Sequence, residues 1–448
     1  MSGRKQIVVV GGVKSDTLDV KSGVPQGSRL GPLLFIIYVN DIISEIESDI
    51  LIFADDTSLI ASGTDPAQTA AQLNRDLAKI SSWATKWKVT FNGSKSKDMI
   101  FSNKCLNNSP PLILNDVIIE RVNSHRHLGL YLTSSLDWSL QVQQVCLKAN
   151  RKLSVLRNVK LLNRQTLDLL YKLTVRSVID YALPVYHNNL KQTDIARLEK
   201  LQYRAAKVVT GALHFTSKDK LNSELGWETI MERGNFLGLN IFQKIHLHET
   251  RPLIRSCMPK LDLEQTITRS KGGYLPFKNH GQKFKTSFFP YFSSRWNNLP
   301  LNAQSKNIED FKIYTKLEFK PPKYKHFSRG TKLGNTLLTR IRVGRSFLNE
   351  HGFTIGLNDN PECLCHYKTE SPQHYFLDCF LYLPERQTLF DLIEHYVPNF
   401  SNWTKKKKLD LILRGINIEN PDLLGTNTIL TKAVQNFILT TNRFKTEE

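Results

Sequence analysis

The chain has 448 residues, of which 61 are Lys or Arg and 41 are Asp or Glu, so its formal net charge is +20. A hydrophobic fraction of 40% can fill cores, and the length allows two or three domains. Six cysteines are too few for a disulfide framework, no signal peptide opens the chain, and the apolar run "PLLFIIYV" is too short to span a bilayer. These features exclude a disulfide-stapled secreted domain and a transmembrane protein. They favour an intracellular protein, in the cytoplasm, the nucleus or both, with a polyanionic partner; the alternative is a basic protein that is merely soluble.

Positive charge is concentrated in residues 271–350, which hold 16 Lys or Arg against 4 Asp or Glu. Aromatic residues are interleaved with the basic ones, as in "FKTSFFPYFSSRW" and "KPPKYKHF". Cations neutralise phosphates and exposed rings stack on bases, so this mixture predicts contacts with nucleic acid.

The first elements are a hairpin and a helix. Residues 6–20 predict a β-hairpin that turns at Gly11 and Gly12. Residues 22–43 begin as a Gly- and Pro-rich loop, and Ser28 is placed to cap a helix with Pro32 in its first turn. Apolar residues lie on most sides of that helix, which predicts that it is buried.

Residues 50–63, "ILIFADDTSLIASG", place two adjacent acids between two apolar runs. The pattern predicts a hairpin with Asp55 and Asp56 at its tip. Two neighbouring carboxylates repel each other unless a cation lies between them, and Mg²⁺ prefers oxygen ligands. A magnesium site and a simple acidic turn both remain open at this point, because Asp-rich turns are common.

A helix and three short β segments come next. Asp65 and Pro66 open the helix, and residues 89–102 predict a strand, a turn and a strand. Residues 111–122 predict a hairpin around Asn115 and Asp116, and residues 126–132 predict a further short strand. The predicted core stripe of the helix is Ala70, Leu73, Leu77, Ile80, Ala84 and Trp87.

From about residue 136 the hydrophobic period becomes helical, and three stripes predict an all-helical module, with the third stripe ending at Gly211. The stripes are Val142, Val145, Ala149, Leu153 and Leu156; Leu167, Leu170, Thr174, Val178 and Tyr181; and Ile195, Leu198, Leu201, Ala205 and Val208.

"SGVPQGSRLGPLLFIIYVNDI" followed by "ILIFADDTSLI" resembles the palm of the reverse transcriptases of non-LTR retrotransposons, of the jockey and LINE kind. The resemblance implies that Asp55 and Asp56 bind Mg²⁺ for two-metal nucleotidyl transfer. It also implies an RNA template, a DNA primer and deoxynucleoside triphosphates as partners. The residues that it places in the loop near the nucleotide and template are Gly23, Pro25, Gln26, Gly27 and Arg29.

Two further motifs extend the resemblance. "WKVTFNGSKSKDMIFS" resembles the next palm motif, an Asn followed three residues later by Lys, which places Lys95 near the incoming triphosphate. The alternative is a solvated turn lysine, since Lys97 lies beside it. "HRHLGLYL" resembles the strand that grips the primer end, with Leu128 and Gly129 at its centre, and the helical stripes resemble the thumb.

The resemblance implies an α+β fold. We expect a partial polymerase palm, an antiparallel sheet with helices on one face, over residues 1–120, with one sheet edge exposed. A helical thumb over 121–225, a basic linker-like region over 226–350 and a Cys/His module with helices over 351–448 follow.

The family also needs a third carboxylate, from a palm motif upstream of the Gln-bearing loop. Before Ser22 the chain offers Asp16 and Asp19, and neither lies in such a motif. We therefore expect a carboxy-terminal part of a reverse transcriptase that polymerises poorly or not at all alone. A non-catalytic nucleic-acid-binding remnant is the alternative, and a group II intron-type polymerase is disfavoured by the long tail. The sequence leaves the oligomeric state open.

"CLCHYKTESPQHYFLDC" places Cys363, Cys365, His374 and Cys379 within 17 residues. Three thiolates and an imidazole suit a tetrahedral Zn²⁺, although a single residue between the first two cysteines is tighter than usual. His366 is a possible substitute ligand, and reduced thiols on a small hairpin are the alternative. The resemblance supports zinc, because many such elements end in a Cys-Cys-His-Cys cluster.

Overall fold

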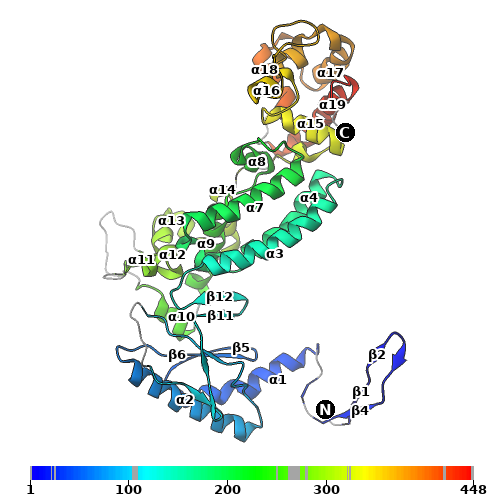
Figure 1. Ribbon diagram of the computed structural model, residues 1–448. Helices are drawn as coiled ribbons and strands as arrows, with labels where there is room; N and C mark the ends of the chain where they lie inside the picture. The colour runs from blue at the N-terminus through cyan, green and yellow to red at the C-terminus, as the bar shows by residue number, and fades with distance from the viewer. Residues whose placement is uncertain are drawn as a thin grey trace. The chain divides into compact units, whose positions relative to one another are not determined.

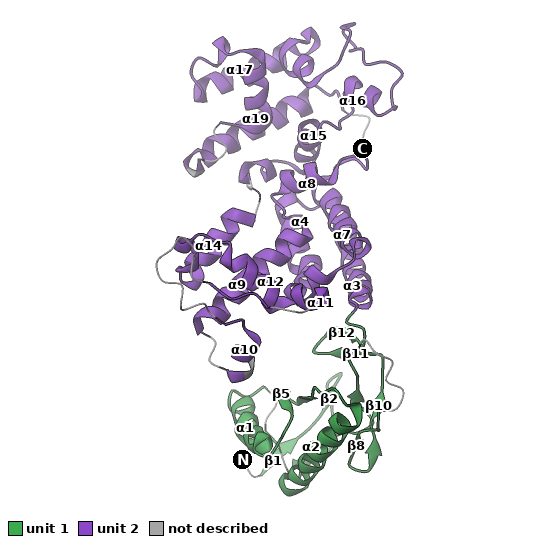
Figure 2. Cartoon of the chain, turned by 90° about the vertical axis from the view of Figure 1, so that its left-hand side faces the viewer, with its two compact units in different colours: residues 1–136 green, residues 137–448 purple. Residues whose placement is uncertain are grey.

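The computed structural model describes residues 3–21, 23–24, 27–102, 109–248, 251–260, 273–277, 281–319, 321, 324–416 and 420–444. The elements are labelled along the chain in Figure 1. The chain divides into two compact units, unit 1 with residues 1–136 and unit 2 with residues 137–448 (Figure 2).

Unit 1 opens with the predicted hairpin. β1 (Arg4–Gln6) pairs with β4 (Leu18–Val20), and β2 (Val9–Val10) pairs with β3 (Val13–Lys14), both antiparallel. Gly11 and Gly12 make the turn with φ of 59° and 86°, a left-handed backbone that glycine adopts without strain. The Gly-Gly prediction is confirmed.

The next helix forms where it was predicted, but it is not buried. In α1 (Leu30–Val39) the amide of Gly31 donates to Ser28 Oγ at 3.0 Å, so Ser28 does cap the first turn, and η1 (Asn40–Ile43) follows. Gly31 is its one buried residue, and Ile36 and Ile37 are 60% and 63% exposed. The prediction of a buried helix is wrong because the described residues cover α1 only in part, through Tyr38, whose ring contacts Trp83 and Trp87.

The acidic segment forms a hairpin beside a long helix. β5 (Asp49–Phe53) pairs with β6 (Asp56–Ile60), and α2 (Pro66–Trp87) follows, with Asp65 Oδ1 accepting from the amide of Ala67 at 2.9 Å. Four of the six predicted stripe residues of α2 are buried, and the stripe packs on the strands that come later in the unit. The core of unit 1 consists of Ala70, Leu77, Leu112, Leu114 and Ile119, with Leu59, Leu73 and Phe91 packed against it.

The remaining strands of unit 1 are short. They are β7 (Lys97–Asp98), β8 (Ile113–Leu114), β9 (Val117–Ile118), β10 (Glu120–Arg121), β11 (Ser124–His127) and β12 (Leu130–Thr133). In the described residues every sheet has two strands, so the continuous antiparallel sheet expected for a palm does not form, although the unit mixes helices and strands as expected.

Two local predictions in this part need correction, and one is confirmed. Residues 126–132 are not a single strand: Leu128 and Gly129, with φ of 46° and 85°, turn β11 back onto β12. Residues 89–102 contain only β7, which pairs in parallel with β10. The hairpin β8–β9 turns at Asn115 and Asp116 as predicted, with φ of 51° and 61°.

The first part of unit 2 is helical. Its elements are α3 (Ser139–Asn158), α4 (Arg164–Leu170), η2 (Tyr171–Arg176), α5 (Ser177–Asp180), α6 (Leu183–Tyr186), η3 (His187–Asn189), α7 (Gln192–Thr210), α8 (Lys218–Leu225) and α9 (Ile230–His248). The first predicted stripe is buried throughout α3, and the third lies on α7, which ends at Gly211 with φ of 68°.

The second stripe is displaced from its prediction. The buried side chains are Leu167, Tyr171, Val175 and Ile179, whereas the predicted Tyr181 is exposed. Residues 171–176 form a π-helix, whose wider turn brings residues four apart onto one line. A straight α-helical period therefore gave the wrong face.

The middle of unit 2 buries several of its aromatic rings. The elements are α10 (Pro252–Cys257), α11 (Gln282–Lys285), α12 (Phe288–Asn297), α13 (Leu301–Gln304), α14 (Ile308–Phe319) and η4 (Lys325–Ser328). Phe292, Trp296 and Phe311 pack with Phe242 of α9 in one core, and Phe327 of η4 is also buried. The predicted base stacking is wrong for Phe292, Trp296 and Phe327, whose rings are buried. Phe284 of α11 is exposed, so the prediction stays open there.

The last part of unit 2 is a separate helical core. Its elements are α15 (Lys332–Arg342), α16 (Asn349–Thr354), η5 (His374–Asp378), η6 (Phe380–Tyr382), α17 (Leu383–Tyr396), η7 (Phe400–Asn402), α18 (Lys405–Arg414), η8 (Pro421–Leu423) and α19 (Leu424–Thr440) (Figure 1). Its core includes Tyr375, Phe376 and Phe437 together with Cys363 and Cys379. No helix in the described ranges has the length and hydropathy that crossing a bilayer requires.

A buried ion-pair network joins the helices of unit 2. Glu224 of α8 accepts from Arg164 of α4 at 2.8 Å and from Arg342 of α15 at 2.5 Å. All three side chains are nearly inaccessible to solvent. The two cations hold the pKa of the Glu224 carboxyl below its usual range in spite of burial, which by itself would raise that pKa.

Candidate functional sites

The two adjacent acids lie at the tip of the hairpin β5–β6. Phe53 pairs with Asp56, so Ala54 and Asp55 make the turn, with Ala54 at φ of 52°. Both carboxylates are exposed. The two acids therefore lie together at the tip of the hairpin, as the sequence predicted.

The hairpin β11–β12, which carries Leu128 and Gly129 in its turn, lies beside this acidic hairpin. Ser58 Oγ of β6 is 3.4 Å from His127 Nε2 of β11. Burial and the neighbouring His127 and Lys97 lower the pKa of His125, while the carboxylate of Asp56 acts in the opposite direction. The fold thus brings together two motifs that are about 70 residues apart.

Asp76 holds the chain where it enters β5, and the sequence analysis missed this residue. Its carboxylate is fully buried and accepts the amides of Glu47 at 3.0 Å and Ser48 at 2.9 Å. The signal was an acid beside Leu77 in the apolar stripe of α2. An acid there has to find donors, because burying an unpaired carboxylate is costly.

Among the described residues, no third carboxylate joins Asp55 and Asp56. Within the described ranges, the one group of three or more His, Cys, Asp or Glu side chains placed to share a metal lies elsewhere, in unit 2. Asp19 pairs with Lys5 in the β1–β4 ladder and is exposed, as is Asp16. Asp55 and Asp56 fit part of a Mg²⁺ site, but the described residues do not complete it.

The loop before α1 is described in part. Gly23 and Gly27 have φ of 78° and 82°, so both positions favour glycine, and Arg29 is exposed at the start of α1. Arg4 of β1 donates to the carbonyl of Gly23, which ties the first hairpin to this loop. Pro25 and Gln26 lie outside the described residues.

The Asn-x-x-Lys motif forms a compact turn. The side-chain oxygen of Asn92 accepts from the amide of Lys95 at 3.1 Å and from Ser94 Oγ at 2.7 Å. Lys95 is exposed, whereas Lys97 forms an ion pair with Glu120 at 2.5 Å. The two lysines therefore differ in their surroundings: Lys95, the lysine of the motif, is exposed to solvent, and Lys97 is paired with an acid.

Cys363, Cys365, His374 and Cys379 form a second candidate site. Their potential ligand atoms all lie within 4.8 Å of one another. Cys363 Sγ is 3.7 Å from Cys379 Sγ, and Cys365 Sγ is 3.2 Å from His374 Nε2. A tetrahedral site with Zn–S bonds of about 2.3 Å has an edge of about 3.8 Å, so the sulfur spacing fits zinc.

Tight local turns bring these four residues together. The amide of Cys363 donates to the carbonyl of Tyr367 at 2.9 Å, and the amide of His366, at φ of 65°, donates to the carbonyl of Cys363 at 2.9 Å. His374 begins the π-turn η5, and the amide of Cys379 donates back to its carbonyl at 2.8 Å. His366 is exposed and lies outside the group, so the structure favours the four predicted ligands over the substitute.

Burial sets the electrostatics of this cluster. Burial raises the pKa of the Cys363 thiol to about 12 and also raises the pKa of Cys379, and it lowers the pKa of His374. Tyr367, which the sequence analysis missed, stacks flat on His374 with ring centroids 4.3 Å apart. A neutral imidazole and thiols that need a cation in order to ionise are the donor set that suits zinc.

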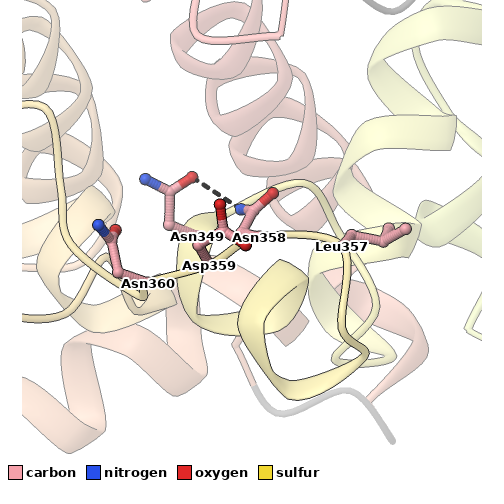
Figure 3. A pocket seen from close by; sticks show the side chains of 5 residues that line it. All are labelled: Asn349, Leu357, Asn358, Asp359 and Asn360. Carbon is pink, nitrogen blue, oxygen red and sulfur yellow. Dashed lines mark hydrogen bonds between the residues drawn. The ribbon is translucent and has the colours of Figure 1, made fainter.

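A surface depression of about 330 Å³ lies near the cluster in sequence (Figure 3). It is lined by Asn349, Leu357, Asn358, Asp359 and Asn360. Asn358 Nδ2 donates to Asn349 Oδ1 at 3.1 Å, and Arg443 also donates to this oxygen at 3.0 Å. The amide of Asn349 thus holds the surrounding loops together, and we assign the depression no ligand.

The helices α3 and α7 pack together and carry many cations. We call these two helices the basic helix pair. Its acids, Asp194 and Glu199, are both buried. Burial and the cations Arg204 and Arg157 lower the pKa of Lys207, so charges from the two helices lie close together. The exposed or half-buried cations of the pair are Lys148, Arg151, Lys152, Arg157, Arg197, Lys200, Arg204 and Lys207.

Residues 4–138 match the family model of the reverse transcriptase (RNA-dependent DNA polymerase). The matched segment covers the acidic hairpin, α2 and the β11–β12 hairpin, which are the elements that the site joins. Unit 1 therefore carries a reverse transcriptase segment.

The curated relatives of the chain include RNA-directed DNA polymerases of non-LTR retrotransposons. The chain is 27% identical over 231 residues to the RNA-directed DNA polymerase from mobile element jockey of Drosophila funebris, which is 47% of this chain and 24% of the relative. It is 26% identical over 262 residues to the probable RNA-directed DNA polymerase from transposon X-element of Drosophila melanogaster, 56% and 28% of the two chains. The chain thus spans about a quarter of the length of these relatives.

Proposed function

We propose that this chain is part of a non-LTR retrotransposon reverse transcriptase, acting on an RNA template, a DNA primer and deoxynucleoside triphosphates. The observation that carries the proposal is the pair Asp55 and Asp56 at a hairpin tip, held beside the β11–β12 hairpin inside the matched segment.

In this proposal Asp55 and Asp56 hold Mg²⁺. When bound, the ions would supply the charge that activates a primer hydroxyl and stabilises the leaving pyrophosphate. Lys95, whose charge is exposed, neutralises the triphosphate. The positive-φ positions Gly23 and Gly27 keep the backbone bare of side chains where a nucleotide approaches, with Pro25, Gln26 and Arg29 in the same loop. Leu128 and Gly129 contact the primer end.

We propose that the chain polymerises poorly or not at all by itself. Two carboxylates leave two metal ions short of ligands, and loss of a metal ligand removes positioning and charge stabilisation from the transition state. The exposed apolar helix α1 also supports weak polymerisation, because a polymerase palm has to be packed in order to position its acids.

The division of the chain belongs to the proposal as well. We assign residues 1–120 to a partial palm, 121–225 to a thumb, 226–350 to a basic region and 351–448 to the Cys/His module with zinc. The basic helix pair falls within the thumb, where six cations are exposed, two are half-buried and both acids are buried, an arrangement suited to a nucleic-acid backbone.

A non-catalytic nucleic-acid-binding protein is the second candidate. It is favoured by the same helix pair and by the Cys/His cluster, because both are complete in the described residues while the acidic site is not. Binding without chemistry would need neither Asp55 nor Asp56.

Iron-mediated cleavage tests the metal site without requiring activity. The chain, bound to an RNA–DNA template–primer, is incubated with Fe²⁺ and ascorbate, and hydroxyl radicals cut the backbone near a bound ion. We expect cuts near residue 55 that Asp55→Asn and Asp56→Asn abolish, while the control Asp16→Asn leaves them. Cuts near residue 55 that persist in both variants would overturn the proposal that Asp55 and Asp56 hold Mg²⁺. Primer extension on the same substrate should give no product, and processive cDNA synthesis would refute the predicted inactivity.

A further inference from the structure

Large exposed side chains flank the buried ligands of the Cys/His cluster. Leu364 lies between Cys363 and Cys365 and is 68% exposed, and Phe380 follows Cys379 and is 66% exposed. Neighbouring Cα atoms are about 3.8 Å apart, so these side chains start within one residue of the ligands. The module buries many other rings, so the exposure of these residues needs an explanation.

Tyr367 adds a flat surface to the same place. One face of its ring lies on His374, at a centroid distance of 4.3 Å and an interplanar angle of 4°. The residue is nevertheless 50% exposed, so the ring is open on the side away from the histidine. Its carbonyl accepts from the amide of Cys363, which fixes the backbone that carries the ring. An open, immobilised ring is what base stacking uses.

The charges beside this surface favour a polyanion. The exposed loop 364–368 contains Lys368 and no acid, and the exposed Glu362 precedes Cys363. Lys405, the first residue of α18, pairs with Asp378 beside the cluster at 2.7 Å, and Lys406 and Lys407 follow it and are exposed. An apolar protein partner would gain nothing from this run of cations, whereas the phosphates of a nucleic-acid strand would be neutralised by it.

We propose that Leu364, Tyr367 and Phe380 form a stacking surface for unpaired bases, so that this module binds single-stranded nucleic acid in preference to duplex. In a duplex the faces of the bases are occupied by their neighbours, and in a single strand they are accessible. The inference rests on the proposed function in one respect, that nucleic acid is the partner, and it specifies which form of nucleic acid this site takes.

An oligonucleotide without bases isolates the stacking contribution. Binding of the full-length, zinc-loaded chain is measured by fluorescence anisotropy with a labelled oligothymidylate of about 20 nucleotides, longer than a usual site. A second probe is the same strand with abasic residues, which keeps the phosphates and lacks the bases. A third probe is a duplex of the same length, in which the faces of the bases are covered. The variants are Phe380→Ala and Leu364→Ala. Phe353→Ala is the matched control, because Phe353 of α16 is also an exposed aromatic residue.

We expect the wild-type chain and Phe353→Ala to bind the base-bearing strand about tenfold or more tighter than the abasic strand. Phe380→Ala and Leu364→Ala should shrink that ratio towards one while their zinc content and their binding of the abasic strand stay unchanged. Equal binding of the two strands by the wild type would overturn the stacking surface. A variant that loses self-association or protein binding, but keeps the ratio, would assign the surface to a protein. Failure to bind any of the three probes would instead overturn the proposed nucleic-acid partner.

Discussion

Loss of one thiol should remove zinc from the Cys/His cluster. Cys379 has no exposed surface and its sulfur lies 3.7 Å from Cys363 Sγ, close to the edge of about 3.8 Å expected for two thiolates on one zinc ion. Cys379→Ser keeps the size of the side chain but replaces a thiolate with a hydroxyl that stays protonated. Zinc at about 100 times its Kd stabilises a folded protein by about 2.7 kcal/mol, and the variant should lose at least that much.

Elemental analysis after dialysis and thermal unfolding measure the two consequences. The wild type should retain about one zinc ion per chain, as a single four-ligand site requires, and the variant close to none. Addition of a chelator should lower the unfolding temperature of the wild type and leave that of Cys379→Ser unchanged. Cys257→Ser is the control, because Cys257 is exposed and lies outside the cluster. A wild type without zinc, or a variant with undiminished zinc, would refute the assignment.

Three further predictions concern stability and the exposed helix. Glu224→Gln leaves two buried arginines without their carboxylate and should cost about 3–5 kcal/mol in urea unfolding, whereas Glu309→Gln on the surface should cost under about 0.5 kcal/mol; equal losses would contradict the network. Burial lowers the pKa of His187 from 6.5 to about 4, so the folded state holds it neutral while the unfolded state takes up a proton. Neutral His187 therefore stabilises the fold above pH 6.5, and up to about 3 kcal/mol of the free energy of unfolding is lost as the pH falls towards 4. His187→Gln should reduce this dependence of the free energy of unfolding on pH. Replacing Ile36 and Ile37 of α1 with Glu should lower the binding of a hydrophobic dye and cost under about 0.5 kcal/mol, and unfolding of the double variant would show that α1 is covered in solution.

Local signals predicted local structure well. Gly11–Gly12 and Asn115–Asp116 both turn hairpins at positive φ, and the pairing of Phe53 with Asp56 puts the acids at a tip as the flanking apolar runs implied. These features depend on residues close in sequence, whose conformational preferences are nearly independent of the rest of the chain.

Features that depend on distant partners could not be predicted in this way. The contact of Ser58 with His127 and the capture of two amides by Asp76 each join separate segments, and no periodicity encodes them. The π-turn that begins at Tyr171 shifted a whole stripe, because a hydrophobic pattern is interpreted with an assumed helical period.

The two errors about burial have one physical origin and opposite directions. The apolar residues of α1 predicted burial and are exposed, while Phe292 and Trp296 of α12 were predicted to be exposed and are buried. Hydrophobicity states what a side chain prefers, and burial also needs a surface that the folded chain places against it. α12 finds such a surface in α9, through Phe292 and Phe242.

The apolar helix α1 and the acidic pair of unit 1 have one property in common, which is that each lacks the neighbouring residues that it needs. Side chains such as Ile36 lack cover and the carboxylates Asp55 and Asp56 lack a third ligand, within the described residues of one unit. In unit 2, by contrast, Cys363 and Cys379 are buried in a packed core and the four ligands lie within 4.8 Å. The proposed function therefore predicts that unit 2 binds nucleic acid even where the acidic pair of unit 1 supports no chemistry. Binding and catalysis should therefore separate experimentally: variants at the Cys/His cluster should change affinity for nucleic acid, and variants at Asp55 and Asp56 should change metal-dependent cleavage at constant affinity.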